Sequence, residues 1–107
     1  MNPFLHIHPE VQDSLHNSKP VVALESTIFS HLGLPSPANA QALTNCIAAI
    51  REAGAVPAIT AVIDGVARVG INESEHERIL GPAKKVGERE IALAIAQRWS
   101  VGATTVS

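Results

Sequence analysis

Two continuous apolar runs stand out along the chain, "VVAL" at residues 21–24 and "AVPAITAVI" at residues 55–63. The first follows Pro20, and the second ends at Asp64-Gly65, a pair that is typical of tight hairpin turns. Apolar runs bounded by residues that break regular structure predict strands that are buried on both faces. The segment "VARVGI" after the turn predicts a third strand.

Helical spacing appears before and between these runs. Pro9 and the acids that follow it predict the start of a helix in "HPEVQDSLHNSKP". After the loop "GLPSPANA", apolar residues at positions 43, 47 and 50 predict a helix with Asn39 as its N-cap and Gly54 at its end. Asn72 is predicted to cap a short polar helix, "ESEHERIL".

The last third of the chain alternates in the same way. "KKV" and "VGATTVS" predict short strands. The segment "EREIALAIAQRWS" between them predicts a helix with one apolar face, formed by Ile91, Ile95 and Trp99. Strands that alternate with helices predict an α/β fold, layered as α/β/α around a largely parallel sheet, in a single domain over residues 1–107.

Composition narrows the class of protein. Of the 107 residues, 46% are hydrophobic and 17% are charged, which predicts one globular domain. A formal net charge of -2 and the lack of a basic stripe argue against a nucleic-acid partner. Cys46 is the only cysteine, so no internal disulfide is expected. The chain shows neither a secretion-signal pattern nor an apolar stretch that could span a bilayer, so a cytoplasmic location without a membrane partner is expected.

Glu25 is the first candidate for chemistry, because it follows directly on the apolar run at residues 21–24. Ligands of open parallel sheets bind beyond the carboxyl ends of the strands, which is where Glu25 is expected. A carboxyl group held partly away from water is suited to donate a proton. The alternative is an acid that caps the backbone of Ser26 or Thr27, or that simply reaches water.

Three further features of the sequence are candidates for chemistry. Lys84 and Lys85 can hold a phosphate or act as nucleophiles near a strand end, or they are a solvated pair. The stretch "GATTVS" can let a ligand approach closely, or it is a small-residue strand packed against a helix. His6 and His8 have the spacing of metal ligands, but we expect them at an unstructured terminus without further ligands, so no metal site is predicted there.

Five segments, in their order along the chain, resemble the pseudouridine-5'-phosphate glycosidase family, also called the indigoidine synthase A-like family. They are "SKPVVALESTIFSH", "PSPANA", "GAVPAITAVIDGVARVGI", "KKVGERE" and "VGATTVS". The resemblance covers nearly all of this chain but only about the first third of a family member. It therefore implies the N-terminal part of a single glycosidase-like domain, with a sheet that is incomplete at its C-terminal end.

The resemblance implies reversible cleavage of the C–C glycosidic bond of pseudouridine 5'-phosphate to uracil and ribose 5-phosphate. Glu25 matches the family's proton donor, Lys85 matches a substrate-binding lysine, and Val106 matches a position that touches the substrate. The family also implies a manganese cofactor and a homotrimer. Its nucleophilic lysine and its manganese-binding aspartate lie beyond Ser107, so the isolated chain is predicted to be inactive.

Two local departures from the family pattern accompany the resemblance. An extra residue stands around Leu32 in "SHLGLPSPAN", where the family usually has "SHGxPxPxN". Gly87 and Glu88 in "VGEREI" replace a serine and an arginine of the usual "VSRRDL". One functional alternative stays open, in which the chain is a non-catalytic, truncated remnant that acts as a binding or interaction module.

Overall fold

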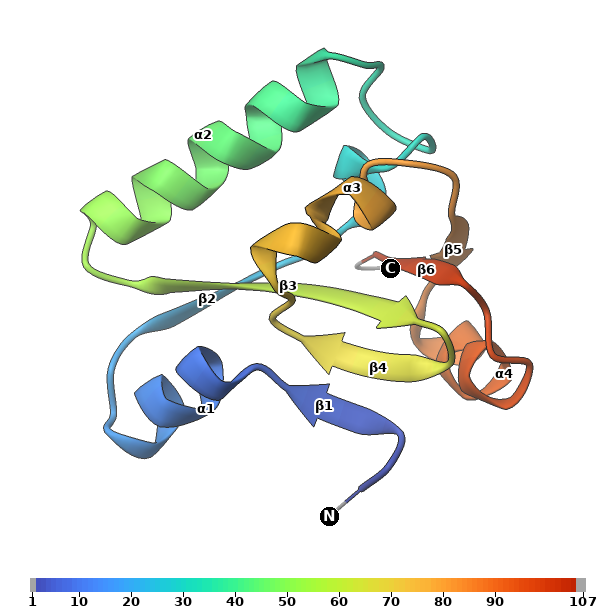
Figure 1. Cartoon of the computed structure of the whole chain (residues 1–107), viewed down its shortest axis with the longest axis horizontal. Helices are drawn as coiled ribbons and strands as arrows, with labels where there is room; N and C mark the ends of the chain where they lie inside the picture. Colours follow the sequence, from blue (N-terminus) through green and yellow to red (C-terminus); the bar gives the residue numbers. More distant parts are fainter. Residues whose placement is uncertain (1, 106–107) are drawn as a thin grey trace.

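The longest apolar run of the sequence forms β3 (Val56–Ile63), the strand around which the sheet is built. Five of its eight residues are buried, as a continuous apolar strand predicts. The computed structural model describes residues 2–105 and places five more strands and four α-helices around β3 (Figure 1). The other strands are β1 (Leu5–Ile7), β2 (Val21–Leu24), β4 (Val66–Val69), β5 (Lys84–Val86) and β6 (Val101–Thr104). The helices are α1 (Pro9–His16), α2 (Ala38–Glu52), α3 (His76–Ile79) and α4 (Ile91–Ala96), with short 3-10 segments η1 (Thr27–Phe29), η2 (Glu73–Glu75) and η3 (Glu88–Glu90).

The sheet is mixed. Its strand order is β1-β4-β3-β6-β5, and β2 pairs with β3 outside this path. The pairs β1–β4, β2–β3 and β5–β6 are parallel, whereas β3–β4 and β3–β6 are antiparallel. The hairpin between β3 and β4 turns at Asp64 and Gly65, whose φ angles of 50° and 79° suit the predicted tight turn. The predicted α/β class is confirmed, with parallel pairs outnumbering antiparallel pairs only narrowly.

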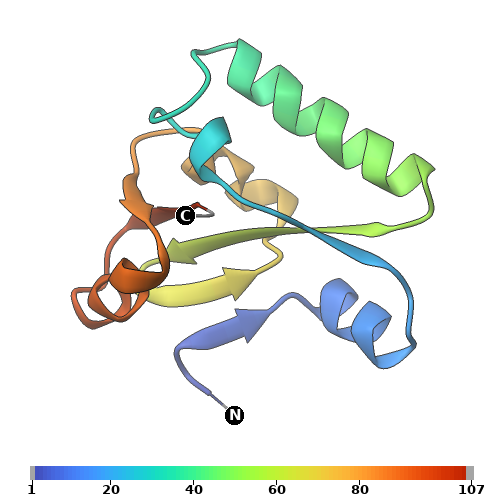
Figure 2. The ribbon, with the colours of Figure 1, turned by 180° about the vertical axis from the view of Figure 1, so that it is seen from behind.

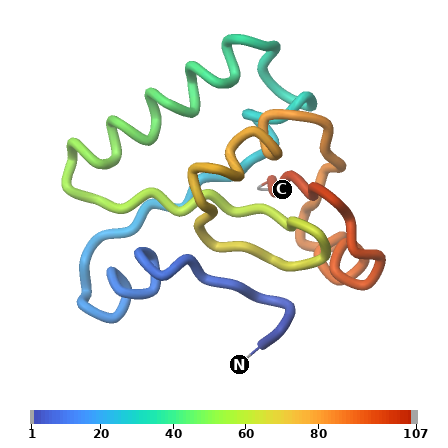
Figure 3. The backbone as a smooth tube through the Cα atoms, viewed as in Figure 1, coloured from blue at the N-terminus to red at the C-terminus, as the bar shows by residue number. Residues whose placement is uncertain are grey.

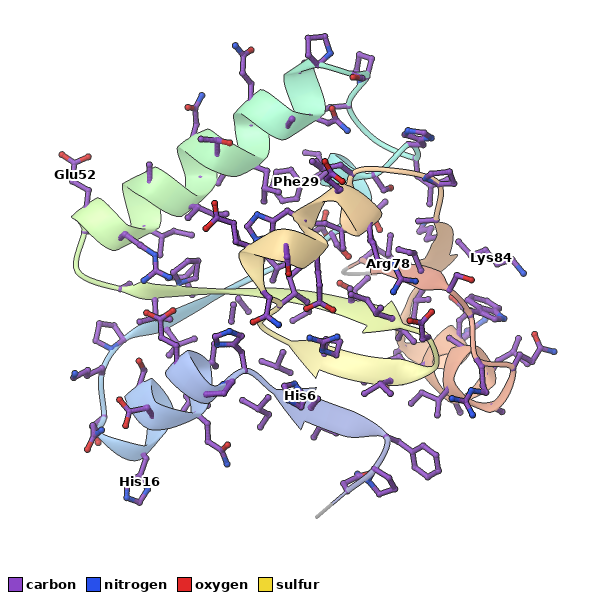
Figure 4. The ribbon with its side chains drawn as sticks, viewed as in Figure 1. His6, His16, Phe29, Glu52, Arg78 and Lys84 are labelled. Carbon is purple, nitrogen blue, oxygen red and sulfur yellow. The ribbon has the colours of Figure 1, made fainter. Side chains whose placement is uncertain are left out.

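Apolar clusters cover both faces of the sheet, which gives the predicted α/β/α layering. On one face, η1, α2 and α3 pack against β3, and Figure 4 shows Phe29 between α2 and α3. The buried members of this cluster are Phe29, Leu43, Ile59, Ala61, Ile63, Ile71 and Ile79. On the other face, α4 packs its buried Ala94 against the sheet, together with Val62, Val86 and Trp99.

Two of the predicted helix starts are confirmed. The helix α1 begins at Pro9, and the Nδ1 atom of the preceding His8 accepts a hydrogen bond from the first-turn backbone. Asn72 caps η2, and its own backbone N–H donates to Oε1 of Glu75 at 3.0 Å. Both caps satisfy backbone groups that a helix start leaves unpaired.

Asn39 does not cap α2, so this prediction is wrong. The N-cap is Pro37, and Asn39 lies in the first turn with only 2% of its surface exposed. Its Nδ2 atom donates to the carbonyl oxygens of Phe29 at 2.9 Å and Leu80 at 3.0 Å. The amide therefore joins three segments of the chain. Gly54, predicted at the end of this helix, lies just beyond it with a φ of 86°.

Two expectations about the N-terminal third are also wrong. The strand β2 is not buried on both faces, since Val22 is 40% exposed. Among the described strands β2 pairs only with β3, so its other side has no neighbour in the sheet. The segment around His6 and His8 is not unstructured, because His6 lies in β1, which pairs with β4.

The last helix is shorter than predicted. It ends at Ala96, and the chain then turns through Arg98, whose φ is 52°. Trp99 therefore lies beyond the helix, although it still packs on the apolar cluster of that face. Ile91, expected on the buried side, is 40% exposed. Within residues 2–105 no helix combines the length and the apolar character that crossing a membrane requires.

Candidate functional site

The carboxyl ends of β2 and β6 meet on the edge of β3. The two strands run toward each other, because β2 is parallel and β6 antiparallel to β3. Leu24 pairs with Ile59 and Ala103 pairs with Ala61, so only Thr60 of β3 separates the two registers. Figure 2 shows β2 in front of β3 leading into η1, and the tube in Figure 3 shows the end of β6 near the same point.

A cluster of four hydroxyl residues, Ser26, Thr27, Thr60 and Thr104, ties these strand ends together and is called the hydroxyl cluster below. Oγ1 of Thr104 lies 2.7 Å from both Oγ1 and the carbonyl oxygen of Thr60, and its single proton can be donated to either. Oγ of Ser26 accepts from the Thr104 N–H at 2.9 Å. Oγ1 of Thr27 donates to the Thr104 carbonyl at 2.8 Å. The polar groups of this otherwise apolar region therefore bond to one another.

Glu25 lies where the sequence predicts it, directly after the last residue of β2, and it is half-buried. The backbone on both sides of it is held by the hydroxyl cluster. The carbonyl of Leu24 accepts from Oγ1 of Thr60 at 3.2 Å, and the N–H of Ser26 donates to the Thr104 carbonyl at 3.2 Å. The backbone that carries the carboxyl group is thus fixed on both sides, which suits a proton donor.

Lys85 lies in β5, the strand on the other side of β6 from β3. It is exposed and pairs in register with Ala103, and the N–H of Thr105 donates to the Val86 carbonyl at 3.0 Å. Lys84 faces away, since its Nζ lies 4.8 Å from the centre of the Trp99 ring on the α4 side (Figure 4). Neighbouring residues of a strand point to opposite faces, so Lys85 points to the face of the sheet opposite to that of Lys84 and Trp99.

The structure therefore places Ser26 and Val86, the residues that follow Glu25 and Lys85, on the two sides of one segment, Thr104–Thr105. Val106, the third predicted site residue, lies outside the described residues. The role of each of these residues stays a prediction.

The loop with the extra residue around Leu32 folds back on η1. The N–H of Gly33 donates to the Ser30 carbonyl at 3.0 Å, and the N–H of Leu34 donates to the Ile28 carbonyl at 2.8 Å. A Cβ atom on Gly33 would clash with the carbonyl oxygen of Ile28, so the close turn requires glycine there. Leu32 is 50% exposed, so the extra residue is accommodated at the surface.

The second departure, at Gly87, is part of a helix start. The Gly87 N–H donates to Oε1 of Glu90 at 3.0 Å at the beginning of η3. Glu88 is exposed. The backbone after Lys85 is thus held by a cap that needs no side chain at position 87.

Other acids and cavities of the described chain belong to different features. A cavity of about 410 Å³ opens between α1, α2 and β3, with His8, Arg51 and His76 among its lining residues. Glu25 and Lys85 line neither this cavity nor the two grooves that run beside Phe4 and beside Trp99. Within residues 2–105, no three His, Cys, Asp or Glu side chains come together as a metal site. The described residues therefore do not fit the manganese that the family resemblance implies.

Three ion pairs, two at the surface and one partly buried, hold acids in structural roles. In each pair the hydrogen-bonded guanidinium keeps the pKa of the carboxyl group below its usual range. The shortest nitrogen–oxygen distance is 2.8 Å in every pair. The pairs are Glu10–Arg51, Asp64–Arg78 and Glu75–Arg68.

Sequence reasoning missed Asn39 and Thr60 as parts of the framework of the site. Asn39 binds the carbonyl of Phe29, at the end of the turn that follows Glu25. Thr60 is the only polar residue of β3, and this break in an apolar strand was the signal that could have identified it. A hydroxyl in a buried strand needs a partner, which here is Thr104.

Comparisons with known proteins agree with this architecture. The profile of the family described as "Indigoidine synthase A like protein" matches residues 10–107. The protein named pseudouridine-5'-phosphate glycosidase in Rhodospirillum centenum is 48% identical to this chain, and the match covers 100% of this chain and 33% of the relative. The protein of the same name in Escherichia coli K12 is 50% identical, and the match covers 96% of this chain and 33% of the relative. The Arabidopsis thaliana protein of the same name is 45% identical, over 94% of this chain and 31% of its own length.

Two solved structures have the same fold. The prealnumycin C-glycosynthase AlnA, in complex with ribulose 5-phosphate, aligns with a TM-score of 0.81 and 31% identity, over 98% of this chain and 33% of its own. An indigoidine synthase A-like protein from Thermotoga maritima aligns with a TM-score of 0.78 and 31% identity, over 95% of this chain and 32% of its own. The chain thus spans about a third of the length of the relatives it matches. With a family profile matched over residues 10–107, the chain belongs to the indigoidine synthase A-like family.

Proposed function

We propose that the full-length protein is a pseudouridine-5'-phosphate glycosidase, which cleaves the C–C glycosidic bond of pseudouridine 5'-phosphate to uracil and ribose 5-phosphate. Family membership and the names of the relatives support this reaction. The observation that carries the proposal is the position of Glu25. It is a half-buried carboxyl group at the junction of two strand ends, with the end of the Lys85 strand on the other side of the same segment.

Glu25 acts as the general acid in this proposal. When the glycosidic bond breaks, the bonding electrons stay on a ring carbon of the base, which is a poor leaving group. Proton delivery to that carbon as the bond breaks gives neutral uracil directly. General acid assistance of this kind contributes about 10²–10⁴-fold to a rate.

Lys85 holds the substrate rather than attacking it. Its side chain is exposed, and a lysine at this position suits the binding of an anionic phosphosugar. The related AlnA structure contains ribulose 5-phosphate, a ligand of that class. We propose that Val106 contacts the substrate through its backbone or by packing, because an apolar side chain offers no polar group.

The remaining parts of the family reaction are expected elsewhere in the full-length protein. The nucleophilic lysine and the manganese site have no counterpart assigned within residues 1–107, so no step of the proposal runs through the metal. We also propose a homotrimer in the cytoplasm. Mass photometry of the full-length protein tests the trimer.

The reaction is tested by incubating the full-length protein with pseudouridine 5'-phosphate and measuring uracil and ribose 5-phosphate. Uridine 5'-phosphate, which has a C–N bond at the same place, is the matched control substrate. We expect release of uracil from pseudouridine 5'-phosphate only. In D₂O, the uracil should carry one deuterium on the carbon that was bonded to the sugar. No uracil release above background would refute the proposal, and ribose 5-phosphate binding without turnover would favour a non-catalytic binding module.

A further inference from the structure

The contact between Ser26 and Thr104 departs from ordinary strand pairing. The Ser26 N–H donates to the Thr104 carbonyl at 3.2 Å, as a backbone ladder would. The Thr104 N–H, however, donates to the side-chain Oγ of Ser26 at 2.9 Å. The hydroxyl therefore takes the place of a backbone carbonyl acceptor, which lets the chain leave the ladder immediately after Glu25. Ser26 is fully buried, with 0% of its surface exposed.

Thr27 also forms a hydrogen bond with Thr104. Its Oγ1 atom donates to the Thr104 carbonyl at 2.8 Å and lies 3.1 Å from the Ala103 carbonyl. The backbone N–H and C=O of Thr104 are thus both bound by the two residues that follow Glu25. These contacts span 76 to 78 positions of sequence, so they fix two distant segments against each other.

We propose that Ser26 and Thr27 are positioning residues, which hold the proton donor Glu25 in register with the end of β6 at Thr104. The inference rests on the proposed function for its catalytic part. Glu25 is covalently attached to Ser26, so any shift of the Ser26 backbone moves the carboxyl group directly. Proton transfer requires a heavy-atom separation of about 2.6–3.2 Å, and a misplacement of about 1 Å can cost about 10²-fold in rate.

Thr27→Val is the sharpest test, because valine keeps the shape of threonine and removes only the hydroxyl. The Thr104 carbonyl still accepts from the Ser26 N–H in this variant, so it is not left unpaired. In the full-length protein we expect kcat for uracil release to fall about tenfold to a hundredfold with little change in KM. The solvent deuterium isotope effect on kcat should rise, since proton transfer becomes the slower step.

Two matched variants separate positioning from general loss of structure. Thr27→Ser retains the hydroxyl and should keep kcat within about threefold of the wild type. Thr44→Val removes an exposed threonine hydroxyl on α2, away from the strand ends, and should leave kcat and the isotope effect unchanged. A Thr27→Val enzyme with wild-type kcat, or one that changes only in KM, overturns the inference.

Hydrogen exchange provides a readout that does not depend on activity. Ser26→Ala removes the acceptor of the Thr104 N–H, so the exchange of that amide should accelerate by at least about tenfold. An unchanged Thr104 exchange rate in an active protein overturns the inference and leaves the proposed function standing. A wild-type protein that releases no uracil overturns the proposed function and, with it, the catalytic part of the inference, whatever the exchange rate shows.

Discussion

Replacing Asn39 by alanine should strongly destabilise the protein. The side chain is 2% exposed, and its Nδ2 atom donates to the carbonyls of Phe29 and Leu80 at 2.9 and 3.0 Å. Its Oδ1 atom also accepts from the Ala40 N–H at 2.9 Å. Alanine supplies none of these partners, so it leaves two carbonyl oxygens of other segments without the donor they have now.

The magnitude follows from those two carbonyls. A buried polar group that loses its partner costs about 1–3 kcal/mol, and the Phe29 bond is fully buried, whereas the Leu80 bond is partly buried. We therefore expect Asn39→Ala to lower the free energy of unfolding by about 2–4 kcal/mol. For a domain of this size, this corresponds to a fall in Tm of roughly 10–20 °C.

Urea denaturation followed by circular dichroism measures this change. Asn45→Ala on the same helix is the matched control, because Asn45 is exposed and alanine favours helices. We expect the control to change the free energy of unfolding by no more than about 0.5 kcal/mol. An Asn39→Ala protein as stable as the Asn45→Ala protein would refute the structural role assigned to the buried amide.

Three further predictions concern the nucleophile, the ion pairs and the loop. The chain of residues 1–107 alone should release no uracil from pseudouridine 5'-phosphate. Borohydride reduction in the presence of ribose 5-phosphate should label none of its lysines. An adduct on Lys85, found by mass spectrometry, would instead make Lys85 the nucleophile. Arg68 holds the pKa of Glu75 below its ordinary value of 4.5, so the ion pair stabilises the fold above pH 4.5 and the effect is lost as pH falls through the lowered pKa. Urea denaturation should therefore find Glu75→Gln less stable than the wild type at neutral pH but nearly equal to it in strong acid, and an equal deficit at both pH values would exclude this linkage. Gly33→Ala should lower the free energy of unfolding by about 1–3 kcal/mol, because its Cβ would clash with the carbonyl oxygen of Ile28. Gly81→Ala is the control, since the nearest atom to its Cβ would be 3.6 Å away, and similar Tm values for the two variants would contradict the argument.

Local patterns predicted most elements because their causes are local. The apolar run of β3 and the Asp64-Gly65 turn need only neighbouring residues to act, and the hairpin forms where it was predicted. Pro9 and Asn72 likewise begin helices through contacts within a few residues. The order of these signals was enough to indicate an α/β fold.

The errors arose where a partner lies far away in sequence. Asn39 looked like a cap, but its partners Phe29 and Leu80 are 10 and 41 residues away, and no local pattern encodes them. Val22 is apolar yet exposed, since hydrophobicity does not reveal how many neighbours a strand has. Trp99 continued a helical spacing that the left-handed backbone at Arg98 interrupts.

The candidate site was predicted in part for the same reason. Glu25 at a strand end follows from the local pattern, whereas its meeting with Thr104 depends on β2 and β6 running in opposite directions along β3. That arrangement is a property of the whole sheet. The hydroxyl cluster could be recognised only once the strand order was known.

The most direct test of the central claim is the rate of uracil release by the full-length Glu25→Gln protein. Glutamine keeps the shape and hydrogen-bonding capacity of the side chain but cannot give up a proton. We predict a fall in kcat of about two orders of magnitude or more, with an unchanged Tm. A Glu25→Gln protein that melts like the wild type and releases uracil at a near-normal rate would contradict the assignment of Glu25 as the proton donor.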